Sequence, residues 1–319
     1  MKVRAARPED LPELERLRRA MPYPGSLFLE EADYLERALE RLRDALPRLA
    51  ELPDVRLLVL TEGEGLSGYL FLEVDDVHGV TQQLQAVLLD FAVFEFAGLA
   101  KLMVRARKIV NAFENEYLVV DLSAQDRRTQ LWFYRCGFRG EQTRVVKYLP
   151  AGFQGAASAD YPIRQARPDD LPFLLEVHAA FTRAYRPAGR EVDLQALESS
   201  YQMSYLLLDL SSPLYFVIEE RASGKRAGYL LLNLGEPVAG KKTFYVYDVA
   251  IAPEFSGRGL SVFLQGKAES IAGVEGGFVY GDGSLEVASL ASWHTQMGYP
   301  VDTIRFSLEC RELPKSRCP

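Results

Sequence analysis

The sequence predicts a mixed α/β protein that contains two successive copies of one unit, each a sheet covered by helices. Three observations support this prediction. The chain has 319 residues, which exceeds the usual size of one domain. The stretch VRAARPEDLPEL at 3–14 recurs as IRQARPDDLPFL at 163–174. Strand-like and helix-like segments then follow in the same order after each copy of this stretch.

Bulk composition is that of an ordinary globular protein and argues against several functions. Hydrophobic residues make up 48% of the chain and charged residues 25%. The net charge of −7 argues against a protein that follows nucleic-acid phosphates, so we expect no nucleic-acid partner. The sequence has no run of about 18 uncharged apolar residues and no apolar signal-peptide core at its start, so we expect neither a membrane span nor secretion.

Cysteine and histidine are too few and too scattered to suggest a metal site. The cysteines are Cys136, Cys310 and Cys318, without CxxC spacing, and the chain has only three histidines. An odd number of cysteines fits a reducing compartment, so we expect a cytoplasmic protein with inert thiols. Nothing in the sequence indicates the oligomeric state.

The repeated stretch predicts the start of a helix in each copy. Asp10 and Asp170 are expected to accept hydrogen bonds from the first free N–H groups of that helix. Pro12 and Pro172 fall in the first helical turn, where a missing N–H costs nothing.

The correspondence between the copies persists along the chain and predicts the domain boundaries. Asp90 matches Asp248, and Glu95 matches Glu254. We expect an N-terminal unit at 1–150, an exposed linker rich in Gly, Ala and Ser at 151–162, and a C-terminal unit at 163–319.

Hydrophobic patterns predict the elements inside each unit. Strands of the second copy are expected at 214–220, 226–234, 243–252, 277–282 and 303–309. Helices of the second copy are expected at about 170–184, 258–272 and 286–297. In the first copy, leucines at alternating spacings of four and three predict a helix that packs on the sheet: Leu35, Leu39, Leu42, Leu46 and Leu49.

The stretch EFSGRGLS at 254–261 joins an expected strand to an expected helix and has the features of an anion site. Its two glycines let the backbone turn N–H groups inward without Cβ clashes. The following helix begins with unpaired N–H donors and a partial positive charge. Arg258 adds a cation, and Ser256 and Ser261 add hydroxyl groups. A plain turn is the alternative.

This strand, loop and helix resemble the GCN5-related N-acetyltransferase (GNAT) family, whose signature is a strand, then Arg/Gln-x-x-Gly-x-Gly/Ala, then a helix. Gly259 takes the place of the central glycine, while Ser256 and Ser261 depart from the two ends of the signature. FYRCGF at 133–138 and HTQMGY at 294–299 fall where the family closes a helix with Gly-Phe. The resemblance covers nearly the whole chain and implies two tandem GNAT-like units, each a mixed, mostly antiparallel sheet flanked by helices.

The resemblance also implies acetyl-CoA as cosubstrate and a small amine as acyl acceptor. The pyrophosphate would lie on the loop, and the pantetheine arm would follow the backbone of the strand before it. The implied cofactor-binding residues are Val249, Ala250, Ile251, Ser256, Gly257, Arg258, Gly259, Leu260 and Ser261. The amine would attack the thioester directly, without a covalent enzyme intermediate.

Two side chains are candidates for catalysis. Asp248, on the strand before the loop, is a candidate base that would act directly or through water, and a strand-end aspartate satisfied by backbone donors is the alternative. The family often uses a tyrosine acid four residues before the glycine of Gly-Phe, and His294 stands there in the second copy. An ordinary histidine donates a proton near pH 7, and a packed helix-end residue is the alternative. His78 and His178 are expected to be structural.

Two tyrosines lie beside the candidate base. Tyr245 and Tyr247 alternate with Val246 and Asp248, so one face of this strand would be aromatic. That face would either line an acceptor pocket or belong to the core.

The first copy has EFAGLAKL at 95–102, where the glycine-rich loop would be. Leu99 and Ala100 stand at the places of Arg258 and Gly259, and Leu102 adds bulk where a small residue is expected. We therefore predict that the first copy does not bind acetyl-CoA. A chain with one degenerate half resembles tandem GNAT proteins of the mycothiol synthase type.

The leading hypothesis is an acetyl-CoA-dependent N-acetyltransferase whose C-terminal unit acts on a small amine. Because the loop departs from the family signature at both ends, a non-catalytic acyl-CoA-binding or regulatory protein is the main alternative. An acyltransferase for a longer acyl chain is a third hypothesis.

Overall fold

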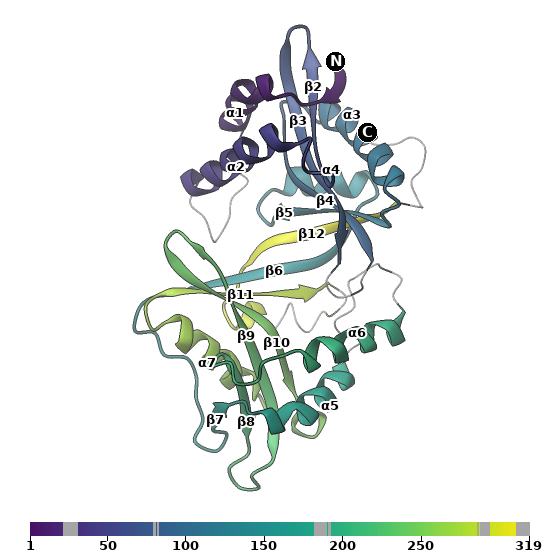
Figure 1. Ribbon diagram of the computed structural model, residues 1–319. Coiled ribbons are helices and arrows are strands. Elements are labelled where there is room, and N and C mark those ends of the chain that lie inside the picture. The colour runs from purple at the N-terminus through teal and green to yellow at the C-terminus, as the bar shows by residue number, and fades with distance from the viewer. Residues whose placement is uncertain are drawn as a thin grey trace. The chain divides into compact units, whose positions relative to one another are not determined.

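The computed structural model describes residues 1–21, 31–78, 81, 83–181, 190, 193–285, 287 and 294–310 (Figure 1). The chain divides into two compact units, Met1–Glu141 with Thr303–Pro319, and Gln142–Asp302. This division differs from the expected boundary at 151–162. The last strand of each sequence copy makes its backbone hydrogen bonds with the sheet of the other unit, and it therefore leaves its own copy.

The first unit contains a sheet in the order β1-β2-β3-β4-β5-β12, whose one parallel pair is β4 with β5. Its strands are β1 (Lys2–Ala5), β2 (Val55–Glu62), β3 (Gly65–Val77), β4 (Leu84–Val93), β5 (Tyr117–Ser123) and β12 (Val301–Glu309). Its helices are α1 (Leu11–Ala20), α2 (Glu31–Ala45), α3 (Phe96–Ala112) and α4 (Arg127–Arg135), with short 3₁₀ turns at Pro8–Asp10 and Leu46–Arg48.

Alternate residues of these strands point to two separate cores. Leu57 and Val59 pack with α1 and α2, whereas Leu58 and Leu60 pack with α3. The predicted leucine stripe lies on the sheet, because Leu42 of α2 and Leu46 of the following 3₁₀ turn are buried in the first of these cores, although the helix ends at Ala45. In Figure 1, α1 and α2 cover one face of β2 and β3, and α3 covers the other.

The second unit contains a sheet in the order β7-β8-β9-β10-β11-β6, whose one parallel pair is β10 with β11. Its strands are β6 (Arg139–Leu149), β7 (Ile163–Gln165), β8 (Tyr215–Glu219), β9 (Arg226–Val238), β10 (Lys241–Ile251) and β11 (Gly277–Ser284). Its helices are α5 (Leu171–Phe181), α6 (Leu194–Leu206) and α7 (Ser261–Ala272), with 3₁₀ turns at Pro168–Asp170 and Pro253–Phe255. Most of the expected helix at 286–297 lies outside the described residues.

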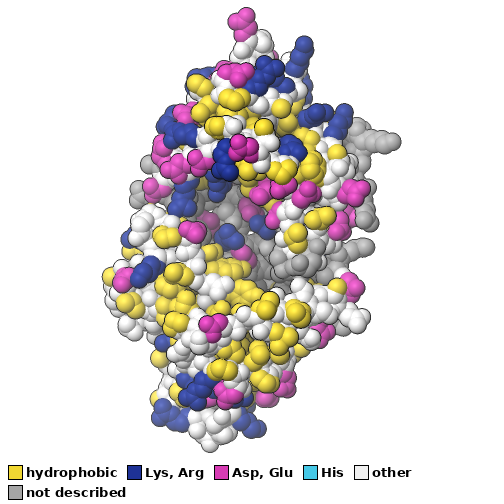
Figure 2. Space-filling view, viewed as in Figure 1, with side chains coloured by type: hydrophobic (Ala, Val, Ile, Leu, Met, Phe, Trp, Pro, Cys, Tyr) yellow, Lys and Arg dark blue, Asp and Glu magenta, His cyan; other side chains and the backbone are white. Residues whose placement is uncertain are grey.

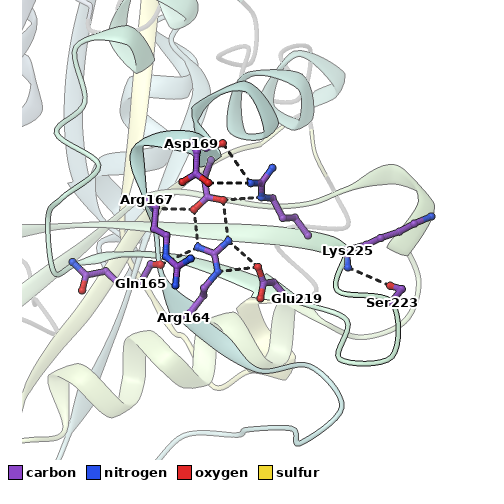
Figure 3. A network of polar contacts seen from close by, with 9 residues as sticks. Arg164, Gln165, Arg167, Asp169, Glu219, Ser223 and Lys225 are labelled. Atoms are coloured by element: carbon purple, nitrogen blue, oxygen red, sulfur yellow. Dashed lines mark hydrogen bonds and ion pairs between the residues drawn. The ribbon is translucent and has the colours of Figure 1, made fainter.

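Each repeated aspartate binds the chain before its helix rather than the helix itself. Asp170 accepts hydrogen bonds from the backbone N–H of Arg167 at 2.8 Å and from the guanidinium of Arg164 at 2.7 and 2.9 Å (Figure 3). Asp10 does the same with Arg7 and Arg4. Burial alone would raise the pKa of Asp170, but the bonds from Arg164 and Arg167 lower it below the ordinary value. The expected helix cap is therefore an anchor between the first strand and the first helix.

The segment expected to be a linker packs closely on α7. The N–H of Gly155 donates to Ser270 Oγ at 2.8 Å. A Cβ at Gly266 would lie 2.3 Å from the carbonyl oxygen of Ala156, so two backbones meet where only glycine fits. Most of the segment is solvent-exposed, as expected, yet it is attached to the second unit.

Candidate functional site

The glycine-rich loop of the second unit has the geometry of an anion site. Gly257 and Gly259 have φ angles of +77° and +74°, the left-handed region that favours glycine. A Cβ at either position would meet no atom within 4 Å, so backbone conformation rather than space requires glycine. Within the described residues, no protein acceptor is recorded for the backbone N–H groups of 257–261. These donors end at the start of α7, where the helix dipole favours an anion.

The side chains of this loop have different places. Leu260 is 1% exposed and anchors the loop in the core of the unit, so only its backbone is available to a ligand. Ser256 and Ser261 lie at the ends of the turn, and Ser256 is exposed. Arg258 is turned to the neighbouring hairpin, where it contacts Glu220 at 3.0 Å. The predicted cation therefore makes an ion pair within the unit, beside the loop backbone.

Within the part of the chain that the structure describes, β10, the strand before the loop, has an edge with no paired strand beyond Tyr245, here called the open edge. Its register with β11 ends at the pair Tyr245 and Tyr280, whereas its register with β9 continues to Ile251. The N–H of Ala252 donates to Ala227 in the β9 direction, and backbone groups alternate along a strand. Val249 and Ile251 therefore direct their N–H and C=O groups to the open edge. Ala250, also predicted to bind the cofactor, directs its backbone to β9 instead.

The corresponding segment of the first unit is already helix. α3 begins at Phe96, and the N–H groups of Gly98 and Leu99 donate to the carbonyl of Glu95. Leu99 and Leu102 are fully buried in the apolar core. The backbone donors at the matching positions of the first unit are thus used inside a helix. The sequence predicts from Leu99, Ala100 and Leu102 that this copy does not bind acetyl-CoA, and the helical backbone at these positions adds a further reason.

Asp248 is the centre of a buried polar cluster. Its side chain accepts hydrogen bonds from Tyr229 Oη at 2.8 Å and from Tyr205 Oη, and contacts His178 Nδ1 at 2.9 Å. Asp248 is only 6% exposed, and its partners come from β9, α6 and α5. These contacts favour a structural role for Asp248 over that of a base, with side-chain partners in place of the expected backbone donors.

The first unit has an equivalent cluster without a phosphate loop beside it. Asp90 accepts a hydrogen bond of 2.5 Å from Tyr69 and lies 3.5 Å from Arg18. Burial raises the pKa of Asp90, and Arg18 and Tyr69 oppose this effect. Since the cluster occurs in both units, it belongs to the shared fold. Both aspartates also lie at a register shift, Asp248 in the pairing of β10 with β9 and Asp90 in the pairing of β4 with β3.

His294 lies beside Tyr299, on the side of α7. Its ring centroid is 6.4 Å from that of Tyr299, whose hydroxyl meets Gln265 of α7. Burial lowers the pKa of His294 to about 4, so the imidazolium form is scarce at neutral pH. This finding runs against the expectation that His294 donates a proton near pH 7. The structure thus places Asp248 and His294 in different surroundings and among different partners.

Tyr245, on the predicted aromatic face, joins three side chains that the sequence analysis does not single out: Arg144, Tyr280 and Asp282. Arg144 of β6 binds Asp282 of β11 through two contacts of 2.8 Å, and Tyr245 Oη lies 3.4 Å from the same carboxylate. The ring of Tyr280 is 5.1 Å from that of Tyr245. In the sequence, Asp282 is marked only as the last residue of the expected strand GFVYGD. Nothing in the sequence places Arg144 beside it, because the strand of Arg144 belongs to the first sequence copy.

Apolar side chains gather near this region of the surface. Figure 2 shows hydrophobic side chains over β9, β10 and the end of α6 in the second unit. Met203, Leu206 and Leu207 are exposed at that end of α6. Among the described residues, no group of three or more potential metal ligands occurs, and no helix is long and apolar enough to cross a membrane.

Comparisons with known proteins agree with this architecture. No family model and no curated protein sequence matches the chain. A solved GCN5-related N-acetyltransferase from Sphaerobacter thermophilus is similar over 97% of this chain and 95% of its own, with 19% identity and a TM-score of 0.54. A glucosamine N-acetyltransferase region of a fungal multi-domain β-N-acetylglucosaminidase is similar over 96% of this chain and 38% of its own, with 15% identity and a TM-score of 0.54. The chain therefore has the GCN5-related N-acetyltransferase fold, in two tandem copies.

Proposed function

We propose that the second unit transfers an acetyl group from acetyl-CoA to a small amine. The observation that carries this proposal is the row of backbone N–H groups at 257–261, which fits a pyrophosphate at a helix start. The open edge of β10 supports it, since Val249 and Ile251 can bind the amide groups of a pantetheine arm as a neighbouring strand would.

In this reaction the amine nitrogen bonds to the thioester carbonyl carbon and the carbon–sulfur bond breaks, and the proton that the nitrogen loses is taken up by the departing sulfur, so that the amide and CoA with a free thiol are released. The carbonyl oxygen becomes negative on the way, and a backbone N–H at the open edge of β10 can stabilise it. The buried position of Asp248 leaves the accessible carboxylate Asp282 as the better candidate to hold the amine. We infer a cytoplasmic protein, and the buried thiols of Cys136 and Cys310, which form no disulfide within the described residues, support this inference.

Calorimetry with acetyl-CoA tests the site. Gly259→Asp places a carboxylate and a strained φ in the loop, so it is expected to abolish binding. Gly63→Asp is the matched control, since Gly63 has a φ of +63°, no neighbour within 4 Å of a Cβ, and a place in the first unit. The control is expected to bind as wild type does. Equal binding by both variants would overturn the loop assignment.

Release of free CoA in the presence of a panel of amines tests catalysis. Turnover of at least one amine is expected. Tight acetyl-CoA binding without turnover of any amine would favour the non-catalytic acyl-CoA-binding protein. Faster turnover with a longer acyl-CoA would favour the third hypothesis.

A further inference from the structure

A polar and aromatic row crosses the sheet of the second unit where β10 and β11 separate. Tyr245 and Tyr280 form the last pair of their register, and Asp282 lies two residues further along β11. Asp282 faces Arg144 directly across the antiparallel pair of β11 and β6. Its side chain is 23% exposed and that of Arg144 is 38% exposed, so solvent reaches both charges.

The row shares a sheet face with the cluster around Asp248. Asn233 pairs with Tyr245 and lies two and four residues beyond Leu231 and Tyr229 on β9, so these side chains point the same way. Tyr229 contacts Asp248, which places the row on the side of α5 and α6. The register shift at Tyr247 keeps Asp248 on this face, although strict alternation predicted that it would face away from the tyrosines.

The first unit holds the same ion pair with different neighbours. Arg305 of β12 binds Asp121 of β5 through two contacts of 2.8 Å. The pair of the parallel register that corresponds to Tyr245 and Tyr280 is Val87 and Val119. The ion pair therefore accompanies the exchange of last strands in both units, whereas the tyrosines occur only beside the glycine-rich loop.

We propose that Asp282, Arg144, Tyr245 and Tyr280 bind the acyl acceptor, and that this acceptor is an amine that also carries a carboxylate. The proposal rests on the proposed function, whose site it extends. Asp282 holds the ammonium group, and the ring of Tyr245 offers it a second, cation–π contact. Arg144 holds the carboxylate. A guanidinium has five N–H donors, so it can serve Asp282 and a ligand carboxylate at once.

Charge balance favours such a dipolar ligand over the alternatives. A purely cationic amine bound at Asp282 would lie beside the guanidinium of Arg144, and a purely anionic ligand at Arg144 would lie beside Asp282. A ligand with both charges matches both side chains. The first sequence copy then has a function in the reaction, because its last strand supplies Arg144 to the acetyl-CoA-binding unit.

Steady-state CoA release by the full-length protein tests the proposal, with amino acids of several side chains and their amides as matched acceptors. The amides keep the amine and lack the carboxylate. Wild type is expected to prefer the acids by about tenfold or more in kcat/KM, the range of one charge-assisted contact. Arg144→Gln is expected to remove this preference by raising KM for the acids, with acetyl-CoA affinity kept. Asp282→Asn is expected to weaken both kinds of acceptor.

Arg305→Gln is the matched control, because it breaks the equivalent ion pair in the unit without the loop. It is expected to keep the preference for acids. Equal use of acids and amides by wild type overturns the proposal, and so does an equal effect of Arg305→Gln and Arg144→Gln. Acetyl-CoA binding without turnover of any acceptor that has both groups also overturns it. A protein that does not bind acetyl-CoA instead overturns the proposed function itself.

Discussion

Replacing Asp248 by alanine is expected to destabilise the second unit by about 3–5 kcal/mol. The side chain has polar partners on three elements, Tyr229 at 2.8 Å, Tyr205, and His178 at 2.9 Å. A hydrogen bond to a charged group contributes roughly 1.5–3 kcal/mol, and the partners would remain buried without their shared acceptor. For a unit of this size such a loss lowers Tm by about 10 °C. The primary effect of Asp248→Ala should therefore be a loss of folding stability rather than of a catalytic group.

Urea unfolding, followed together with acetyl-CoA calorimetry, checks this reasoning. Asp169→Ala is the control, because its carboxylate is exposed and 3.9 Å from Arg226, and a change below about 0.5 kcal/mol is expected. Asp90→Ala should destabilise the first unit in the same way as Asp248→Ala does the second. An Asp248→Ala protein with wild-type stability and acetyl-CoA affinity, yet no turnover, would refute the structural role and identify Asp248 as the base.

Three further predictions concern other parts of the chain. Burial depresses the pKa of His294 to about 4 in the folded protein, below the unfolded value of 6.5. The neutral ring therefore contributes stability above pH 6.5, and this contribution is lost as pH falls through 4. Urea unfolding should show that the drop in unfolding free energy from pH 7 to pH 5 is about 1–2 kcal/mol smaller in His294→Gln than in wild type. An equal drop in both proteins would contradict the assigned pKa. Gly266→Ala should lower Tm by several degrees in a thermal melt, since its Cβ would meet the Ala156 carbonyl at 2.3 Å. Gly224 has open space around it and a φ of +68°, so Gly224→Ala should lower the free energy of unfolding by only about 1 kcal/mol. A fragment 163–319 should not fold cooperatively, because it lacks β6 for β11 and has no β5 for β12, and a native-like circular dichroism melt of that fragment would contradict the strand exchange.

Local patterns were enough to predict most elements. The strands expected at 226–234, 243–252 and 277–282 correspond to β9, β10 and β11, whose alternating and apolar residues form one core. The leucine stripe of α2 packs on the sheet because helical spacing alone sets which side chains share a face. The helix expected from residue 258 begins three residues later, at Ser261, because the left-handed φ angles of Gly257 and Gly259 are not helical.

The sequence predicts only part of the candidate site. The loop is predictable because glycine spacing and a helix start are local features, and Gly257 and Gly259 have left-handed φ angles before α7. The surroundings of Asp248 could not be read, because His178, Tyr205 and Tyr229 lie far from it along the chain. Nor could the burial that lowers the pKa of His294, since it depends on packing around the ring.

By itself the sequence determined that the chain repeats one α/β unit, and that only the second copy keeps a glycine-rich turn into a helix. These are properties of neighbouring residues, so composition and spacing are enough to reveal them. Tertiary structure alone decided that the last strands exchange units and that Arg144 reaches Asp282. The reason is physical: strand edges pair through backbone groups that are the same in every residue, so side-chain patterns predict a strand but not its partner.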